Sequence, residues 1–268
     1  MLEPRDLVKA IDHGIDLRER QEWPLYQGGI LDRSAYVTAS EIGTCARKIK
    51  LDKQFMKETG YDPNEGTKTK SSDAWGFWER GHNVERWIVD HLTRGWASNE
   101  WELKYLGEEQ VSFTDGVQSG TPDGIAINHA DEAFYTLEFK SMDPRTNVSR
   151  LPKITHRDQV VQNTDLIAHN MDLSPAGGLI LYVDASDHKR RFPHMIEYTD
   201  DHAARLQDRA EMIMSTEPED LKPEGLFSPN NDCQYCKHTA ACNMMVAHAK
   251  NGKDFGHDLN ATANGVFG

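Results

Sequence analysis

The fold is decided by one apolar stretch, Ala133-Phe134-Tyr135-Thr136-Leu137-Glu138-Phe139-Lys140. Its aromatic and β-branched residues are typical of a β-strand. Side chains alternate between the two faces of a strand, so Glu138 and Lys140 point to one face and the neighbouring apolar residues to the other. The sequence therefore predicts a rigid strand that presents a carboxylate and an ammonium group side by side.

A tight turn precedes this strand, Gly120-Thr121-Pro122-Asp123-Gly124. Proline and glycine flank Asp123, and the apolar residues 125–127 that follow predict a second strand. If the two strands pair as a hairpin, Asp123 approaches Glu138. Two carboxylates can hold Mg²⁺ or Mn²⁺ through oxygen, and a nearby Lys140 can orient an attacking water, so the pair favours metal-dependent phosphodiester hydrolysis. The alternative is a hairpin with a surface ion pair and an ordinary turn aspartate.

Residues 73–96 are predicted to form a long helix. Glu85 shares one face of this helix with small and apolar residues, namely Trp78, Gly81, Ile88 and Leu92. A buried carboxylate needs a cation or hydrogen bonds, so Glu85 is the candidate for a third metal ligand. The alternatives are a salt bridge to Arg80 or Arg86, simple exposure at the edge of the face, or His82 as the ligand instead.

Further helices are expected over residues 152–170 and 201–214, and further strands over 177–183 and 191–199. On the first of these helices, Gln159 is expected to face the site and to hydrogen-bond phosphate or sugar. The order strand, strand, helix, strand, strand, helix predicts an α/β arrangement around one sheet.

The four cysteines of the chain are Cys45, Cys233, Cys236 and Cys242. The last three form a Cys-x-x-Cys-x5-Cys pattern, and Cys45 is predicted to lie on a helix capped by Thr38 or Ser40. We find no signal peptide and no apolar run that could cross a membrane, so we expect a reducing cytoplasm, where clustered cysteines indicate a metal. Four thiolates can hold zinc or an iron–sulfur cluster, and their spacing does not separate the two. Two disulfides, or a chance cluster that leaves Cys45 free, would fit the same four positions.

Length and charge constrain the organisation and the partners of the chain. Its 268 residues fit an N-terminal helical extension over 1–37, one domain over 38–243 and a disordered tail over 244–268. The net charge of −13 argues against a simple DNA-binding protein, because phosphate contacts need cations. A local basic face is still sufficient, and its candidate residues are Arg47, Lys48, Arg145, Arg150, Lys153 and Arg157.

Together these motifs resemble the RecB-like nucleases of the PD-(D/E)xK superfamily, specifically the iron–sulfur branch that includes the CRISPR-associated exonucleases and the AddB nuclease domain. The family's Gly-x-x-x-His/Glu motif is matched by residues 81–85, its Pro-Asp element by residues 122–123 and its Glu-x-Lys element by residues 138–140. One cysteine upstream and three downstream complete the pattern. The chain departs from it in one place, because Gln159 fits the family's Gln-x-x-x-Tyr motif but Asn163 stands where the tyrosine is expected.

The resemblance implies a restriction-endonuclease-like α/β core, a mixed central sheet flanked by helices, with a helical extension joined through a 4Fe–4S cluster. It implies that Mg²⁺ or Mn²⁺ is held by Glu85, Asp123, Glu138 and the Phe139 carbonyl, that Lys140 positions the water, and that Gln159 contacts the substrate or Lys140. The implied activity is a DNA exonuclease acting on single-stranded DNA or DNA ends in recombination, end resection or DNA processing, alone, as a homo-oligomer or with a recombination partner protein. The alternatives are a structure-specific endonuclease, a DNA-binding or assembly subunit with weak catalysis, and zinc in place of the cluster.

Overall fold

The computed structural model describes residues 32–60, 72–96, 98–224, 233 and 236–251, with only the backbone described at 72–78 and 246–251. Most of the predicted N-terminal extension and the end of the predicted tail, residues 252–268, lie outside this range. Residues 61–71, between the first two long helices, lie outside it as well.

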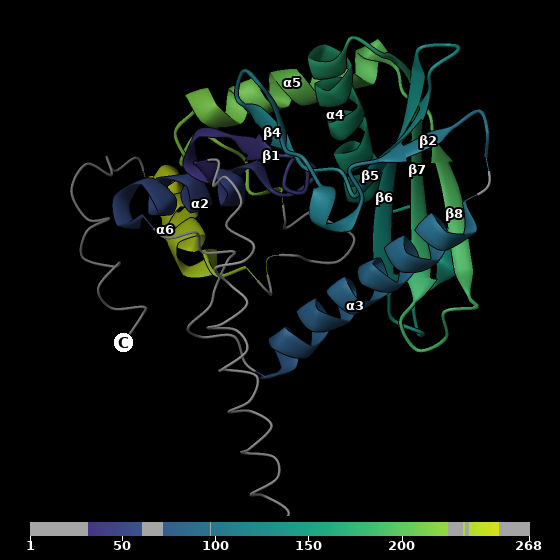
Figure 1. The fold of residues 1–268 in the computed structure, drawn as a ribbon. Helices are drawn as coiled ribbons and strands as arrows, with labels where there is room; N and C mark the ends of the chain where they lie inside the picture. Colours follow the sequence, from purple (N-terminus) through teal and green to yellow (C-terminus); the bar gives the residue numbers. More distant parts are fainter. Residues whose placement is uncertain (1–31, 61–71, 97, 225–232, 234–235, 252–268) are drawn as a thin grey trace, which may run out of the picture.

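The central sheet has five strands in the order β2-β5-β6-β7-β8 (Figure 1). The strands are β2 (Glu102–Lys104), β5 (Gly124–Asn128), β6 (Ala133–Met142), β7 (Ser174–Asp184) and β8 (Arg191–Ile196). β6 and β7 are parallel, and the other neighbouring pairs are antiparallel. The sheet is therefore mixed and flanked by helices, as the sequence predicts.

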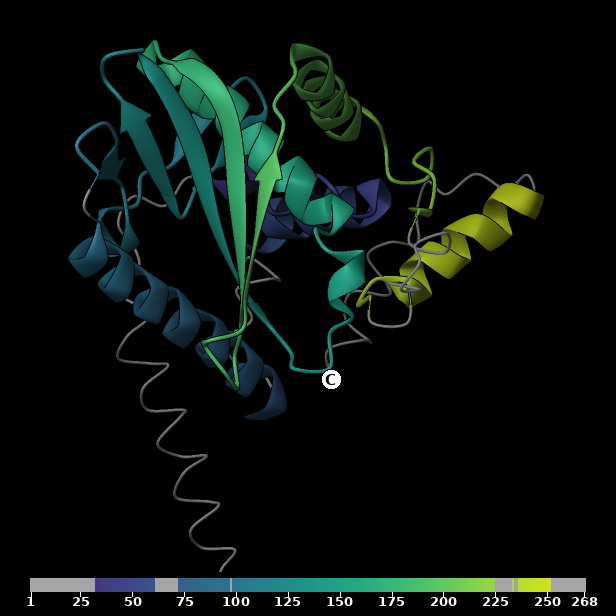
Figure 2. The same ribbon diagram turned by 90° about the vertical axis from the view of Figure 1, so that its right-hand side faces the viewer.

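Helices cover both faces of this sheet (Figures 1 and 2). On one face lies α3 (Ser72–Gly95), whose buried Val84 and Ile88 form a cluster with residues of β6 that include Leu137 and Phe139. On the opposite face, α4 (Ile154–Met171) packs against β6 and β7, and α5 (Asp200–Ser215) packs against α4. The alternation of β6 thus directs Leu137 and Phe139 toward α3 and leaves Glu138 and Lys140 on the side of α4.

A second, smaller sheet adjoins this core in the order β1-β4-β3. It comprises β1 (Val37–Thr38), β4 (Gln118–Gly120) and β3 (Phe113–Asp115), with β1 and β4 parallel. Short 3-10 turns occur at Arg33–Ala35, Gly107–Glu109 and Val148–Arg150. Among the described helices, none is both long and apolar enough to cross a membrane.

The segment around Cys45 differs from the expected helix. Helix α2 (Ala46–Thr59) begins one residue later, and Cys45 is its N-cap in an extended conformation. Thr38 does not cap this helix, because it belongs to β1, where it pairs with Ser119. The predicted capping was therefore wrong, since a strand rather than a helix precedes the turn to Cys45.

The C-terminal part of the chain is held against α2. Helix α6 (Thr239–Asn251) shows that residues 244–251 of the predicted disordered tail are helical. Asp52 of α2 is fully buried and accepts hydrogen bonds from His238 Nε2 at 2.6 Å and Lys48 Nζ at 2.7 Å. We call the contacts of α2 with residues 219–242 the C-terminal clasp.

Candidate active site

The pairing of β5 with β6 brings Asp123 to Glu138. Gly124 is the register partner of Leu137, and the Asp123 N–H donates to the Leu137 carbonyl at 3.2 Å. The Asp123 carboxylate in turn accepts a hydrogen bond on Oδ2 from the Phe139 N–H at 2.5 Å. The turn aspartate is therefore fixed by backbone contacts on both sides, beside the strand position of Glu138.

Glu138 lies at the centre of the site and is only 1% exposed. Its Oε1 accepts hydrogen bonds from Lys140 Nζ at 2.5 Å and from Gln159 Nε2 at 2.7 Å. Its Oε2 is buried and has no hydrogen-bond partner among the described residues. A buried carboxylate oxygen without a donor is costly, so this atom marks a position where a cation would be stabilised.

Glu85 reaches the same site from α3, at its rim. Its side chain is 26% exposed, and Oε2 lies 3.7 Å from His82 Nδ1. Gln110 bridges Glu85 and Asp123, because its Nε2 donates to Glu85 Oε1 at 2.9 Å and lies 3.5 Å from Asp123 Oδ1. Glu85 is thus next to the apolar face of α3 rather than buried within it, and that face is centred on Val84 and Ile88.

The protonation behaviour of the site follows from this crowding of negative charge. Burial, followed by the charges of Glu138 and Glu85, raises the pKa of Asp123 well above its usual value. Burial also raises the pKa of Glu138, although Lys140 opposes the shift. Burial alone would lower the pKa of Lys140, but the two carboxylates outweigh it and raise this pKa, so Lys140 stays a cation. The site favours binding of a further positive charge.

The donor set fits a hard divalent cation. Asp123, Glu138 and Glu85 offer only carboxylate oxygens, which Mg²⁺ and Mn²⁺ prefer over nitrogen and sulfur. Within the described residues, no three histidine, cysteine, aspartate or glutamate side chains are gathered tightly enough to hold a metal as they stand. The bound metal and the role of the Phe139 carbonyl therefore stay predictions.

Three residues near the site were not predicted as functional. Gln110 follows a 3-10 turn and carries no sequence signal that points to the site. His156 lies one helical turn before Gln159, and this spacing was a signal that could have placed it on the same face of α4. Tyr182 is the register partner of Lys140 on β7, which only the sheet topology reveals.

The predicted DNA-contacting cations fall into two groups. Arg150, Lys153 and Arg157 are exposed around the start of α4, and Arg145 is 87% exposed while paired with Asp143 at 2.8 Å. Arg47 and Lys48 belong instead to the C-terminal clasp. Arg47 is 5% exposed and donates to the carbonyls of Leu221 at 2.7 Å and Glu219 at 3.1 Å, and Lys48 pairs with the buried Asp52. DNA contact by Arg47 conflicts with this burial, because its guanidinium is already engaged by the protein.

The four cysteines lie in the two segments that the clasp joins. None of the four is in a disulfide, and each is partly exposed. Arg47, two residues after Cys45, has its Nη1 3.4 Å from Cys242 Sγ, and the Cys236 N–H donates to the Cys233 carbonyl at 3.2 Å. The fold therefore brings the N-terminal end of α2 to Cys242, but no three cysteine side chains among the described residues are gathered into a metal site, and the four-cysteine cluster stays a prediction.

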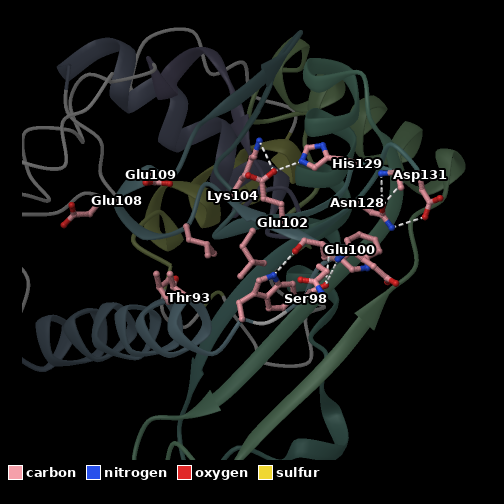
Figure 3. Close-up of a pocket in the computed structure, with 17 residues that line it drawn as sticks. Thr93, Ser98, Glu100, Glu102, Lys104, Glu108, Glu109, Asn128, His129 and Asp131 are labelled. Atoms are coloured by element: carbon pink, nitrogen blue, oxygen red, sulfur yellow. Dashed lines mark hydrogen bonds and ion pairs between the residues drawn. The ribbon is translucent and has the colours of Figure 1, made fainter.

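A pocket of about 1170 Å³ lies between the end of α3 and the edge strand β2 (Figure 3), and it is not lined by Asp123, Glu138 or Lys140. Its charged lining is mainly acidic: Glu100, Glu102, Glu108, Glu109 and Asp131 against Lys104 and His129. Figure 3 shows Lys104 and His129 both turned to Glu102, which offsets their charge. Such a lining disfavours a phosphate backbone, so this hollow is not the candidate active site.

The sequence matches no protein-family model and no curated protein. Among solved structures, the crystal structure of SSO0001 aligns with a TM-score of 0.52 at 15% identity, covering 87% of this chain and 96% of that one. An alkaline exonuclease from Laribacter hongkongensis aligns with a TM-score of 0.47 at 15% identity, covering 78% of this chain and 95% of that one. A phage-related exonuclease from Haemophilus somnus 129PT aligns with a TM-score of 0.48 at 11% identity, covering 67% and 92%. The similarity to SSO0001 shows a shared fold, whereas the two exonuclease alignments are too weak to support an argument about this chain.

Proposed function

We propose that the chain is a Mg²⁺- or Mn²⁺-dependent deoxyribonuclease, an exonuclease that hydrolyses phosphodiester bonds of single-stranded DNA or of DNA ends. One observation carries the proposal: Asp123, Glu138 and Lys140 converge at the β5–β6 fork while Glu138 Oε2 remains buried without a donor among the described residues. If the Glu138–Lys140 ion pair only stabilised the fold, neither a buried Glu138 oxygen without a donor nor a second carboxylate beside the pair would be expected.

Asp123 and Glu138, with Glu85 at the rim, would hold the metal ion, which when bound polarises the phosphoryl oxygen and supplies an activated water. Lys140 keeps its charge and is oriented by Glu138 Oε1, so its ammonium can position the attacking water and offset negative charge in the transition state. Gln159 holds the same Glu138 oxygen from α4 and thereby fixes the carboxylate in one orientation.

A 4Fe–4S cluster on Cys45, Cys233, Cys236 and Cys242 belongs to the same proposal, with zinc as the alternative. Its support is that the clasp brings Arg47, two residues after Cys45, to Cys242, and that none of the four cysteines is in a disulfide. A cluster there would tie the ends of the domain to each other. The absorbance spectrum of anaerobically purified protein, with iron and zinc analysis, distinguishes the two metals: a broad visible absorption with iron supports the cluster, and zinc without that absorption supports the alternative.

The decisive experiment compares end-labelled linear single-stranded DNA with a circular single strand, in Mg²⁺ or Mn²⁺. Wild type should degrade the linear substrate, Lys140→Ala should lose at least about a hundredfold in rate, and the circle should survive. The control is Lys104→Ala, a strand lysine of β2 whose side chain is 37% exposed and lies away from the site.

Each other outcome has a defined meaning. Cleavage of the circle that is lost with Lys140→Ala would indicate an endonuclease at the same site. The absence of cleavage by freshly prepared, metal-loaded wild type would overturn the nuclease proposal and favour a DNA-binding or assembly subunit.

A further inference from the structure

The first turn of α4 carries an imidazole that the chemistry proposed above does not use. His156 Nδ1 lies 2.8 Å from the Tyr182 hydroxyl, and the two rings are stacked with centroids 5.7 Å apart. The backbone N–H of Lys153 donates to the same hydroxyl at 3.2 Å. Tyr182 is 1% exposed, so this arrangement is shielded from water on the strand side.

The hydrogen bonds define the tautomer of His156. A phenol has one proton to donate, and its oxygen already accepts from Lys153 N–H. The buried Tyr182 proton needs an acceptor, and of the two hydrogen-bond partners found among the described residues Lys153 N–H is a donor, so His156 Nδ1 is assigned as the acceptor and the ring proton as residing on Nε2. Burial, followed by the positive charges of Lys140 and Lys153, lowers the pKa of His156 to about 3, so the imidazole stays neutral.

This neutral donor stands beside the proposed catalytic residues. Tyr182 on β7 is the register partner of Lys140 on β6. Gln159, one turn further along α4, is buried and holds Glu138, whereas His156 is half-buried. Burial thus decreases from Gln159 to His156, and the exposed Lys153 and Arg157 lie beside His156 at the start of α4.

We propose that His156 donates its Nε2–H to a non-bridging phosphate oxygen of the DNA strand adjacent to the bond that is cut, and that Tyr182 is the positioning residue that fixes this tautomer. The inference rests on the proposed nuclease function and names a substrate contact of that site. The positive dipole end of α4 favours an anion at the same place. A neutral imidazole adds a directed hydrogen bond there while leaving the charge balance around Lys140 unchanged.

Binding is measured in a Lys140→Ala background, in which the oligonucleotide is not consumed. A short fluorescent single-stranded DNA should bind about ten- to a hundredfold more weakly when His156→Ala is added, the range for a hydrogen bond to a charged group. His156→Gln, whose amide nitrogen can replace Nε2 as a donor, should recover most of the affinity. His169→Ala is the matched control, because this histidine lies in the last turn of the same helix with its side chain 55% exposed.

Tyr182→Phe tests the positioning role. Alone it should weaken binding about three- to tenfold, since an unfixed imidazole loses part of one hydrogen bond. Combined with His156→Ala it should add no further loss, because its effect passes through the imidazole. Equal losses in the presence and absence of His156 would show that Tyr182 acts by another route, and would overturn this part of the proposal.

Two further readouts separate a failure of this inference from a failure of the proposed function. In steady-state digestion, His156→Ala should raise KM more than it lowers kcat. Nitrogen NMR of His156 should report the Nε2–H tautomer in the free protein. If wild type cuts DNA and needs Lys140, but His156→Ala changes neither KM nor oligonucleotide affinity, the contact does not exist and the nuclease function stands. If wild type does not cut, the binding comparison still decides whether His156 contacts DNA.

Discussion

At the scale of single residues, Asp123 shows how a turn position becomes a reactive one. The turn fixes the backbone, the Phe139 N–H holds one carboxylate oxygen, and two other carboxylates approach. Each of these neighbours comes from a different element: β6 supplies Glu138 and α3 supplies Glu85. The raised pKa of Asp123 is therefore a property of the assembled fold, and it destabilises the ionised protein when no cation is bound.

Replacing Asp123 with Asn should stabilise the metal-free protein near pH 8. The folded pKa of Asp123 lies above its unfolded value of about 4, so the wild type loses stability as pH rises from there through the folded pKa, and Asn avoids this loss. We expect a melting temperature about 2–4 °C higher, corresponding to ~1 kcal/mol, in buffer free of divalent metal, and almost no difference near pH 4. Added Mg²⁺ should stabilise wild type only. A less stable Asn variant at pH 8 would contradict this account.

Gln159→Ala should weaken metal binding without unfolding the protein. The substitution removes the donor that fixes Glu138 Oε1, and loss of such a supporting hydrogen bond costs about ten- to a hundredfold in metal affinity or activity. Calorimetric titration with Mn²⁺ measures the affinity directly.

The control for that titration is Gln162→Ala on the same helix. Gln162 is also buried, but its amide donates to the carbonyls of Val37 and Ser119 in the small sheet. This variant should lower the melting temperature and leave Mn²⁺ affinity unchanged. Equal affinity losses in both variants would assign the Gln159 effect to general loosening of α4.

The alternation of β6 was sufficient to predict that Glu138 and Lys140 share one face, because a strand has only two faces. The same sequence could not predict that Glu85 lies at a rim, since its position depends on how α3 crosses the sheet. Nor could it reveal Gln110 or Tyr182, whose roles arise from register and loop path rather than from spacing within one element. The alternation along one strand thus predicted the Glu138–Lys140 pair. The positions of Glu85, Gln110 and Tyr182 depend on tertiary contacts.

At the scale of elements, the distance between α4 and β7 controls the site. Gly178 of β7 lies against Val160 of α4 so closely that an added Cβ would fall 2.1 Å from Val160 Cγ1. Val160 follows Gln159 directly, so a displacement of the helix here moves the side chain that holds Glu138. The sequence predicts a strand at Gly178, but only the packing explains why that position has no side chain.

Gly178→Ala should therefore destabilise the protein by about 1–3 kcal/mol, the usual cost of overpacking a buried contact. Chemical denaturation measures this change. Gly81→Ala on α3 is the matched comparison, because nothing lies within 4 Å of its added Cβ, and it should stabilise by roughly 0.5–1 kcal/mol through helix propensity. If both variants were stabilised, α4 would have to be free to move away from β7.

At the scale of the whole molecule, the C-terminal clasp ties residues far apart in sequence to one helix. Arg47 reaches carbonyls of residues 219 and 221, and Arg209 of α5 pairs with Glu224 at 2.6 Å. Glu224 also accepts from the Ala46 N–H at 2.9 Å, so the start of α2, α5 and the C-terminal segment share one network. The sequence predicts Arg47 as a DNA-contacting cation, but its side chain instead binds the C-terminal segment. No local sequence pattern distinguishes these two roles.

Asp52 is the buried anion of the clasp, so replacing it tests how much its charge contributes to the stability of the protein. Burial alone would raise its pKa, but hydrogen bonds from His238 and Lys48 and the charge of Lys237 outweigh burial and lower this pKa well below the usual range. The stabilisation is thus present above the unfolded pKa of about 4 and is lost as pH falls toward the lowered folded value.

Asp52→Asn leaves the lysines and His238 without their anion, so we expect a loss of about 3 kcal/mol at pH 7. Melting temperatures measured from pH 7 down to about 3 should draw closer for wild type and variant, because in acid the unfolded wild-type chain takes up a proton at Asp52 that the folded chain does not. A constant difference across that range would mean that the clasp depends on packing and not on the Asp52 charge.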